Sequence, residues 1–339
     1  MQKGALAIGA AALAALFAAG HAAAQQNFYH DNKITVLVGG TAGGGFDIFS
    51  RTMANHLGRL IPGTPSIIVQ DMPGGGGIVV TNHIYNTAPK DGTVIAYVGP
   101  MAVQPLLSPG DSKIRFDSQK ITWVGSLSST HSMLFAFHTT PFKSAEDLFT
   151  RQMIVAGTGA ASTTDTYPKI LNAVLGTKFK LITGYQGSKE TMIAIERGEA
   201  DGRFMSIDSL QTTSPGWLRD GWARMLLQAA VTRLPEFPDV PTARDLAKTE
   251  AQRQAVDFAF MQDEMGRPIA APPGIPEDRK RMLREAFAKM VKDPAFLAEA
   301  KAHGLEATGP LTGEQVEDMV KKIYATPKEI IARVAAAMN

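Results

Sequence analysis

A strand, a glycine-rich loop and a helix follow one another near the start of the chain, and this unit occurs twice. The apolar run ITVLV (34–38) leads into GGTAGGGFD (39–47), which has five glycines, and then into a segment with helical apolar spacing. Further along, MIVA (153–156) leads into GTGAASTTD (157–165) and again into a helical segment. Glycine lets the backbone approach a bound group closely, and the first N–H groups of a helix have no partner within it. The two units predict an α/β chain with two loops suited to hold an anion.

Alternating strands and helices extend each unit into a mostly parallel sheet. The first series has strands at 34–38, 66–69 and 94–98 and helices at 46–60 and 77–86; the second has strands at 153–156, 179–182, 202–204 and 225–228 and helices at 162–175 and 188–197. Extended passages are expected at 121–139 and 256–276, and C-terminal helices at 277–291, 294–303 and 313–323. This order predicts two lobes joined by paired hinge strands, with a cleft between them. Lobe I is expected to comprise 25–131 and 266–339, and lobe II 132–265.

The first 24 residues have the pattern of a cleavable export signal. Lys3 precedes an apolar run from Ala5 to Ala19, and Ala22-Ala23-Ala24 offers a small-residue cleavage site. We therefore expect cleavage near Ala24 and a mature protein free in the periplasm. The apolar run is too short for a membrane span, and the chain has no cysteine to carry a lipid anchor, a disulfide or a thiol–metal site.

Charge and motifs argue against several function classes. The chain has 34 Lys and Arg and 32 Asp and Glu, so its net charge of +2 does not favour a nucleic-acid partner. The first loop matches neither the dinucleotide pattern G-x-G-x-x-G nor a P-loop, which needs Lys-Ser/Thr. The histidines lack metal-binding spacing. A G-x-S-x-G elbow and an S-x-x-K pair are also missing. We expect no catalytic residue, no metal and no cofactor, and an enzyme is the least favoured class.

The first loop suits a carboxylate better than a phosphate. Asp47 falls in the first helical turn, where an acid is favourable for the helix dipole and accepts from a hydroxyl, an ammonium or a water, but repels a phosphate. Taken singly, each loop is more typical of a tight turn. Their pairing across two lobes of an exported chain favours ligand binding.

Motifs along the whole mature chain resemble one receptor family. In order, they are ITVLVGGTAGGGFD, QDMPGGGGIVVTN, APKDGTVIA, GTGAASTT, GYQGSKE, AIERGEADG, LPEFPDVPTARDLA, APPGIPEDRKRMLREAF and KDPAFLAEAKAHGLE. The order is similar to that of the extracytoplasmic solute receptors of tripartite tricarboxylate transporters, also called the Bug family. The resemblance implies a type II periplasmic-binding-protein fold, monomeric, whose lobes close on a small carboxylate and deliver it to large and small membrane subunits. A periplasmic subunit that presents its ligand to a sensor kinase is the alternative.

The resemblance also implies the ligand-binding residues. They are Thr41, Ala42, Gly43, Gly44, Gly45, Phe46 and Asp47 in the first loop, Gly157, Thr158, Gly159, Ala160, Ser162 and Thr163 in the second, and Tyr185 and Ser206. Many members have Thr or Ser where this chain has Phe46, and Asp-Ser where it has Met205-Ser206. If Phe46 faces the cleft it favours a ligand with an apolar body; otherwise it packs at the helix start.

Three further features have two interpretations. Arg203 and Arg267 either bind a carboxylate in bidentate fashion or form surface or interlobe salt bridges. PGGGG (73–77) either binds an anion or lets a helix start close to the sheet.

Overall fold

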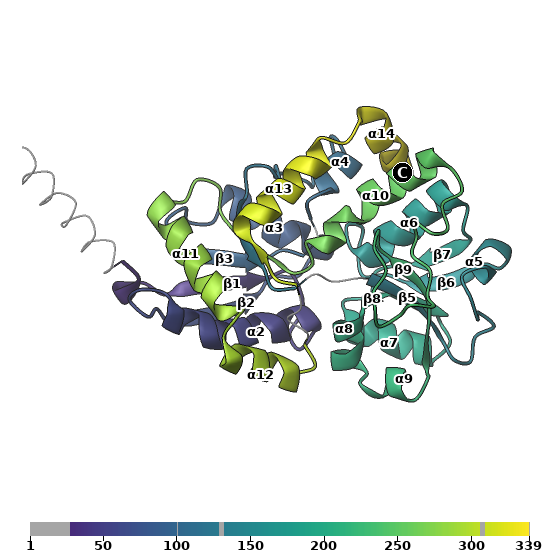
Figure 1. Ribbon diagram of the computed structural model, residues 1–339, viewed down its shortest axis with the longest axis horizontal. Coiled ribbons are helices and arrows are strands. Elements are labelled where there is room, and N and C mark those ends of the chain that lie inside the picture. The colour runs from purple at the N-terminus through teal and green to yellow at the C-terminus, as the bar shows by residue number, and fades with distance from the viewer. Residues whose placement is uncertain (1–27, 100, 129–131, 306–308, 339) are drawn as a thin grey trace, which may run out of the picture.

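The computed structural model describes residues 28–99, 101–128, 132–305 and 309–338. The predicted signal peptide therefore lies outside the described residues. Within these ranges the strands form two separate sheets, each with helices packed around it (Figure 1). No helix in the described ranges is long and apolar enough to cross a membrane.

The first sheet is built from the first and the last strands of the described chain. Its order is β11-β4-β10-β3-β1-β2, from β1 (Ile34–Val38), β2 (Ile67–Asp71), β3 (Val94–Tyr97), β4 (Thr122–Ser126), β10 (Pro268–Ala271) and β11 (Leu311–Thr312). β1 is parallel to β2 and β3, whereas β10 lies antiparallel between β3 and β4, and β11 is antiparallel to β4. The sheet is therefore mixed, and the prediction of a mostly parallel sheet is wrong. The helices of this sheet are α2 (Gly45–Leu57), α3 (Ile78–Asn86), α4 (Gln104–Leu107), α11 (Glu277–Met290), α12 (Pro294–Ala302) and α13 (Gly313–Tyr324).

The second sheet is built from the middle of the chain. Its order is β7-β6-β8-β5-β9, from β5 (Ser132–Phe137), β6 (Met153–Ala156), β7 (Phe179–Ile182), β8 (Gly202–Ser206) and β9 (Ala223–Ala229). β6 is parallel to β7 and β8, and β5 runs antiparallel to β8 and β9. Its helices are α5 (Asp147–Thr150), α6 (Thr163–Leu175), α7 (Ser188–Glu196), α8 (Ile207–Thr213) and α9 (Gly216–Arg219).

The chain passes between the sheets at two adjacent places. The first is the link from β4 to β5, and the second is the link from α10 (Glu250–Glu264) to β10. The Leu127 N–H donates to the Arg267 carbonyl at 3.1 Å, and the Arg267 N–H donates to the Ser128 carbonyl at 3.1 Å. These paired links confirm the two-lobed fold, while the predicted lobe boundaries stay a prediction.

Each lobe has its own apolar core. In lobe I, Val36 and Val38 of β1 pack with Phe49 and Met53 of α2, and all four are fully buried. Phe49 and Met53 are four residues apart and so occupy one face of the helix. The core positions of the first unit thus fix α2, and with it the loop before α2, against the sheet.

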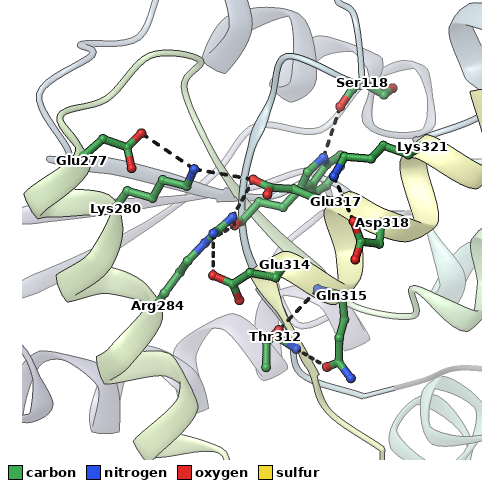
Figure 2. Close-up of polar contacts among 11 residues, drawn as sticks. Ser118, Glu277, Lys280, Arg284, Thr312, Glu314, Gln315, Glu317, Asp318 and Lys321 are labelled. Carbon is green, nitrogen blue, oxygen red and sulfur yellow. Dashed lines mark hydrogen bonds and ion pairs between the residues drawn. The ribbon is translucent and has the colours of Figure 1, made fainter.

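Charged contacts hold the C-terminal helices against lobe I. Arg284 of α11 forms ion pairs with Glu314 at 2.6 Å and Glu317 at 2.5 Å, both on α13 (Figure 2). The same guanidinium donates to the Trp123 carbonyl of β4. Because α11, α13 and β4 share one arginine, the C-terminal segment is held to the first sheet.

The last helix reaches the second lobe. α14 (Lys328–Ala336) packs against α4 of lobe I and against α10 and α6 (Figure 1). Near its end, the Lys169 ammonium of α6 donates to the Met338 carbonyl at 3.2 Å. The C-terminal segment therefore touches both lobes on the side of α10.

The extended passage predicted at 256–276 is wrong over its first part. Residues up to Glu264 belong to α10, and the strand is only β10. Thr249 and Gln252 form a capping box that starts the helix upstream of the predicted passage. Val256 and Phe260 are buried with a spacing of four, so the β-forming side chains of this segment serve as the apolar face of a helix.

Candidate functional site

A cavity of about 450 Å³ lies between the two lobes. Its walls come from the ends of β1, β3 and β8 and from the loops that start α2, α6 and α7. The predicted site residues that line it are Thr41, Gly44, Gly45, Phe46, Thr158, Ser162, Thr163, Tyr185 and Ser206. Those outside the lining are Ala42, Gly43, Asp47, Gly157, Gly159 and Ala160. The structure therefore brings both predicted loops to one cavity.

The first loop presents backbone donors at the start of α2. Gly44 is the N-cap residue and has no side chain to satisfy the first N–H groups of the helix. Asp47 is only 3% exposed and does not line the cavity. Its carboxylate accepts from the Gly43 N–H at 2.7 Å and pairs with Arg51 Nε at 2.6 Å. The acid thus holds the loop in shape and leaves the helix start open to the cavity.

The second loop is held in a closely similar way. Asp165, in the first turn of α6, is 1% exposed and accepts from the Gly159 N–H at 3.1 Å and from the Thr183 hydroxyl. A Cβ on Gly157 would lie 2.1 Å from Asp165 Oδ1, so only glycine fits there. Sequence reasoning missed Asp165, although an acid that follows a glycine loop in a first helical turn occurs in both units. The repeated signal was available in the sequence.

The lobes touch one another around the cavity. A Cβ on Gly76 would lie 2.4 Å from the Ser162 backbone nitrogen, and one on Gly187 would lie 2.9 Å from Thr41 Oγ1. Gln104, which is 2% exposed, donates from Nε2 to the Ala161 carbonyl at 3.1 Å. These contacts join the first lobe to the second loop and describe a closed cleft.

The segment at 73–77 has the second of the roles considered for it and also borders the cavity, while anion binding there stays a prediction. Pro73, Gly74, Gly75 and Gly76 line the cavity. A Cβ on Gly77 would lie 2.6 Å from the Val98 carbonyl, so this glycine also lets α3 begin close to the first sheet.

Aromatic side chains shape the wall of lobe I. Phe46 is half-buried and lines the cavity, with its ring centroid 4.4 Å from that of Tyr97 at an interplanar angle of 39°. The glycines Gly40 and Gly99 leave room for this ring. Phe46 therefore faces the cleft while it packs on Tyr97, which combines both interpretations of this residue.

On lobe II, Tyr185 and Ser206 contribute polar groups. The Tyr185 hydroxyl donates to Glu199 at 3.3 Å, and burial, followed by the charge of Glu199, raises the pKa of this tyrosine. The Ser206 hydroxyl caps α8 by accepting from the Ser209 N–H at 3.3 Å. Each of the two residues makes a hydrogen bond within lobe II and also lines the cavity.

Buried charges complete the lining. Arg203 of β8 and Arg267 at the start of β10 are 4% and 1% exposed, and both line the cavity. Arg267 lies over the Phe49 ring, with Cζ 4.6 Å from the centroid, and donates to the Tyr97 hydroxyl at 3.3 Å. Neither side chain lies at the surface.

Asp263, at the end of α10, is also in the cavity lining and is 4% exposed. It accepts a hydrogen bond from the Tyr167 hydroxyl. Burial raises the pKa of Asp263 to about 7, and hydrogen bonds from Tyr167 and Ser132 offset only part of this effect. Its position was not found from the sequence, because this segment was predicted to be extended.

Among the described residues, no group of three or more His, Cys, Asp or Glu side chains is placed to hold a metal ion.

Comparison with known proteins gives the family. The model of the tripartite tricarboxylate transporter family receptor matches residues 50–335. A Cupriavidus necator protein named "UPF0065 protein in gbd 5'region" is 28% identical over 97% of this chain and 95% of its own length. The family consists of solute-binding receptors and not of enzymes, so the prediction that this chain is not an enzyme is confirmed.

Solved structures give the fold. An R. palustris protein solved with adipate has a TM-score of 0.68 and 17% identity, covering 90% of this chain and 98% of its own. MatC from Rhodopseudomonas palustris, solved with bound malate, has a TM-score of 0.65 and 20% identity, covering 91% and 99%. With the family model matching most of its length, the chain belongs to the tripartite tricarboxylate transporter receptor family.

Proposed function

We propose that this receptor captures a small carboxylate in the periplasm, between its two lobes, and delivers it to the large and small membrane subunits of a tripartite transporter. The observation that carries the proposal is the cavity itself. Two helix-start loops, one from each lobe, line it with backbone and hydroxyl groups, and in each loop a buried aspartate holds the glycines in place. Gly44 leaves the start of α2 without a side-chain cap, and helix starts with free N–H groups are suited to anions. The start of α6 is capped by the Ser162 hydroxyl, which accepts from the Thr164 N–H.

The ligands of similar structures support the choice of a carboxylate. The R. palustris protein was solved with adipate and MatC with malate. A cavity of about 450 Å³ is within the usual range for small-molecule sites. We therefore extend the carboxylate class, and not one particular acid, to this chain.

Thermal unfolding with a panel of acids tests the proposal. The panel contains adipate, malate, succinate, citrate, benzoate and aspartate, because dicarboxylates, hydroxy acids and aromatic acids all remain candidates. An acid at about 100 times its dissociation constant should stabilise the native state by about 2.7 kcal/mol. If no acid in the panel raises the melting temperature, the proposed function is wrong.

A loop variant tests the site itself. Gly44→Val adds bulk where the first helical N–H groups face the cavity, and a Cβ there would lie 3.2 Å from the Thr41 carbonyl. We expect acid binding to be lost while the far-UV circular dichroism is retained. Gly216→Val in α9 is the control, because Gly216 is outside the cavity lining. A Cβ there would also meet close neighbours, the side chains of Asp220 and Arg219. Equal acid affinity in the two variants would remove the first loop from the site.

Delivery and location need separate tests. Vesicles that contain the large and small membrane subunits should take up the bound acid only when the receptor is added. N-terminal sequencing of the protein from a periplasmic extract should begin near Gln25. Uptake at the same rate without the receptor would contradict the transport role.

A further inference from the structure

Arg203 is a buried cation in the wall of the cavity. It lies in β8, whose neighbours are β6 and β5 in the second sheet. Only 4% of the residue is exposed, and it is part of the cavity lining. Its Nη1 donates to the Thr191 hydroxyl in α7, close to where that helix begins. The guanidinium therefore lies on the lobe II side of the cavity, near the start of α7.

The hydrogen bonds of Arg203 do not balance its charge. Nε donates to the Phe204 carbonyl at 3.1 Å, and Nη1 donates to Thr191, so both acceptors are neutral. Nη2 has no partner in the described part of the chain, where no carboxylate oxygen lies within 4.0 Å of this guanidinium. Removing such a charge from water is costly unless an anion pairs with it.

One carboxylate lies near enough to act on Arg203, but it is already engaged. Burial lowers the pKa of Arg203 to about 10, and Asp165 partly opposes this effect. The Asp165 carboxylate accepts from the Gly159 N–H, the Thr164 hydroxyl and the Thr183 hydroxyl. It serves the second loop and leaves the guanidinium without an ion-pair partner.

We propose that Arg203 is the counter-ion for a carboxylate of the bound acid, on the lobe II side of the cavity. The assignment rests on the proposed function and adds to it a side chain that distinguishes an anionic acid from its neutral amide. The starts of α6 and α7 lie beside the same wall and favour negative charge there. A planar guanidinium binds a carboxylate through two parallel N–H donors, which makes it selective as well as attractive.

Calorimetry with matched acids and variants tests the pairing. The probes are the acid of the panel that binds most tightly and its amide, in which one carboxylate is replaced by a neutral group of similar size. Arg203→Gln should weaken binding of the acid by about 30-fold or more, because it leaves a desolvated carboxylate unpaired. Amidation at the paired carboxylate should cost the wild type about as much, and should cost the Arg203→Gln variant less than about threefold. Arg203→Lys, which keeps the charge but loses the planar fork, should lie between the two.

Arg224 gives the matched control. It lies on β9 of the same sheet, is half-buried, donates to the Phe142 carbonyl at 2.7 Å and is outside the cavity lining. Arg224→Gln should bind the acid as the wild type does. If Arg203→Gln and Arg224→Gln bind the acid equally well, the assignment is overturned while the proposed function stands; if the wild type binds no acid, both fail.

Stability without acid separates a binding role from a structural one. Removing an unbalanced buried charge relieves its desolvation cost, so Arg203→Met should have a melting temperature equal to or above that of the wild type. If the hydrogen bonds to Thr191 and Phe204 are the reason for the residue, the melting temperature of Arg203→Met should fall instead. A lower melting temperature combined with unchanged acid binding in Arg203→Gln would establish the structural role and refute the proposal.

Discussion

Replacing Asp263 by Asn should change how the stability of the receptor depends on pH. Asp263 is 4% exposed at the end of α10, and burial raises its pKa from 3.8 to about 7. The carboxyl therefore stays protonated up to a higher pH in the folded chain than in the unfolded chain. Asn keeps an oxygen that can accept from the Tyr167 hydroxyl but has no proton to lose.

The sign and size of the effect follow from linkage. Because the folded-state pKa is the higher one, the stability that Asp263 provides is fully present below pH 3.8 and is lost as the pH rises toward 7. Each pH unit in this window costs about 1.4 kcal/mol. Between pH 5 and pH 8 the wild type should therefore lose about 3 kcal/mol relative to Asp263→Asn. A constant offset of about 1–3 kcal/mol from the unpaired amide does not alter this difference.

Urea unfolding of both proteins at half-unit steps from pH 5 to pH 8.5 measures the difference directly. Subtracting the two free energies of unfolding cancels the titration of groups that the proteins share. Asp239→Asn, at an exposed position, is the control and should follow the wild type at every pH. Parallel curves for the wild type and Asp263→Asn would show that Asp263 titrates equally in both states, and the argument from burial would be refuted.

Three further substitutions test the closed cleft. Gly76→Ala should prevent closure, because the backbone there has φ +70° and a Cβ would lie 2.4 Å from the Ser162 nitrogen; small-angle scattering should then show no decrease in radius of gyration with acid, and a normal decrease would contradict this. Gln104→Leu removes the hydrogen bond to the Ala161 carbonyl and should weaken acid binding about 5- to 30-fold by calorimetry, whereas unchanged affinity would show that the bond does not favour closure. Phe46→Ser should shift the affinity ranking toward small polar acids, and an identical ranking would show that the ring acts only in packing.

The sequence predicted the parts of the fold that depend on local patterns. The strands at 34–38, 153–156 and 179–182 have the predicted bounds, and the helices that follow the glycine loops begin within one residue of the predictions. These segments combine a short apolar run with glycines, a signal that little else in a chain produces. Both glycine loops line one cavity because each follows a strand that runs parallel to its neighbours, β1 or β6, and the loops after such strands gather at one edge of a sheet.

Segments whose structure depends on distant contacts were not predicted. In α10 the residues Val256, Phe258 and Phe260 alternate with other side chains as in a strand, yet they lie in a helix whose start is set upstream by Thr249. Propensity alone favours the strand, and burial against the rest of the core overrides it. The same limit hid Asp263, since its place in the cavity depends on that helix.

Asp47 shows why finding a loop in the sequence does not assign a role to each of its residues. A first-turn acid is compatible with a ligand contact and with a bond back to its own loop, and the sequence is the same in both cases. The structure shows the second arrangement at Asp47 and again at Asp165, each bonded to a glycine N–H of its loop. The acids thus fix loop shape, and the backbone presents the donors. Because backbone donors are alike in any loop of this shape, we expect the choice of acid to depend on the side chains that reach the cavity beside them, chiefly Phe46 and Arg203.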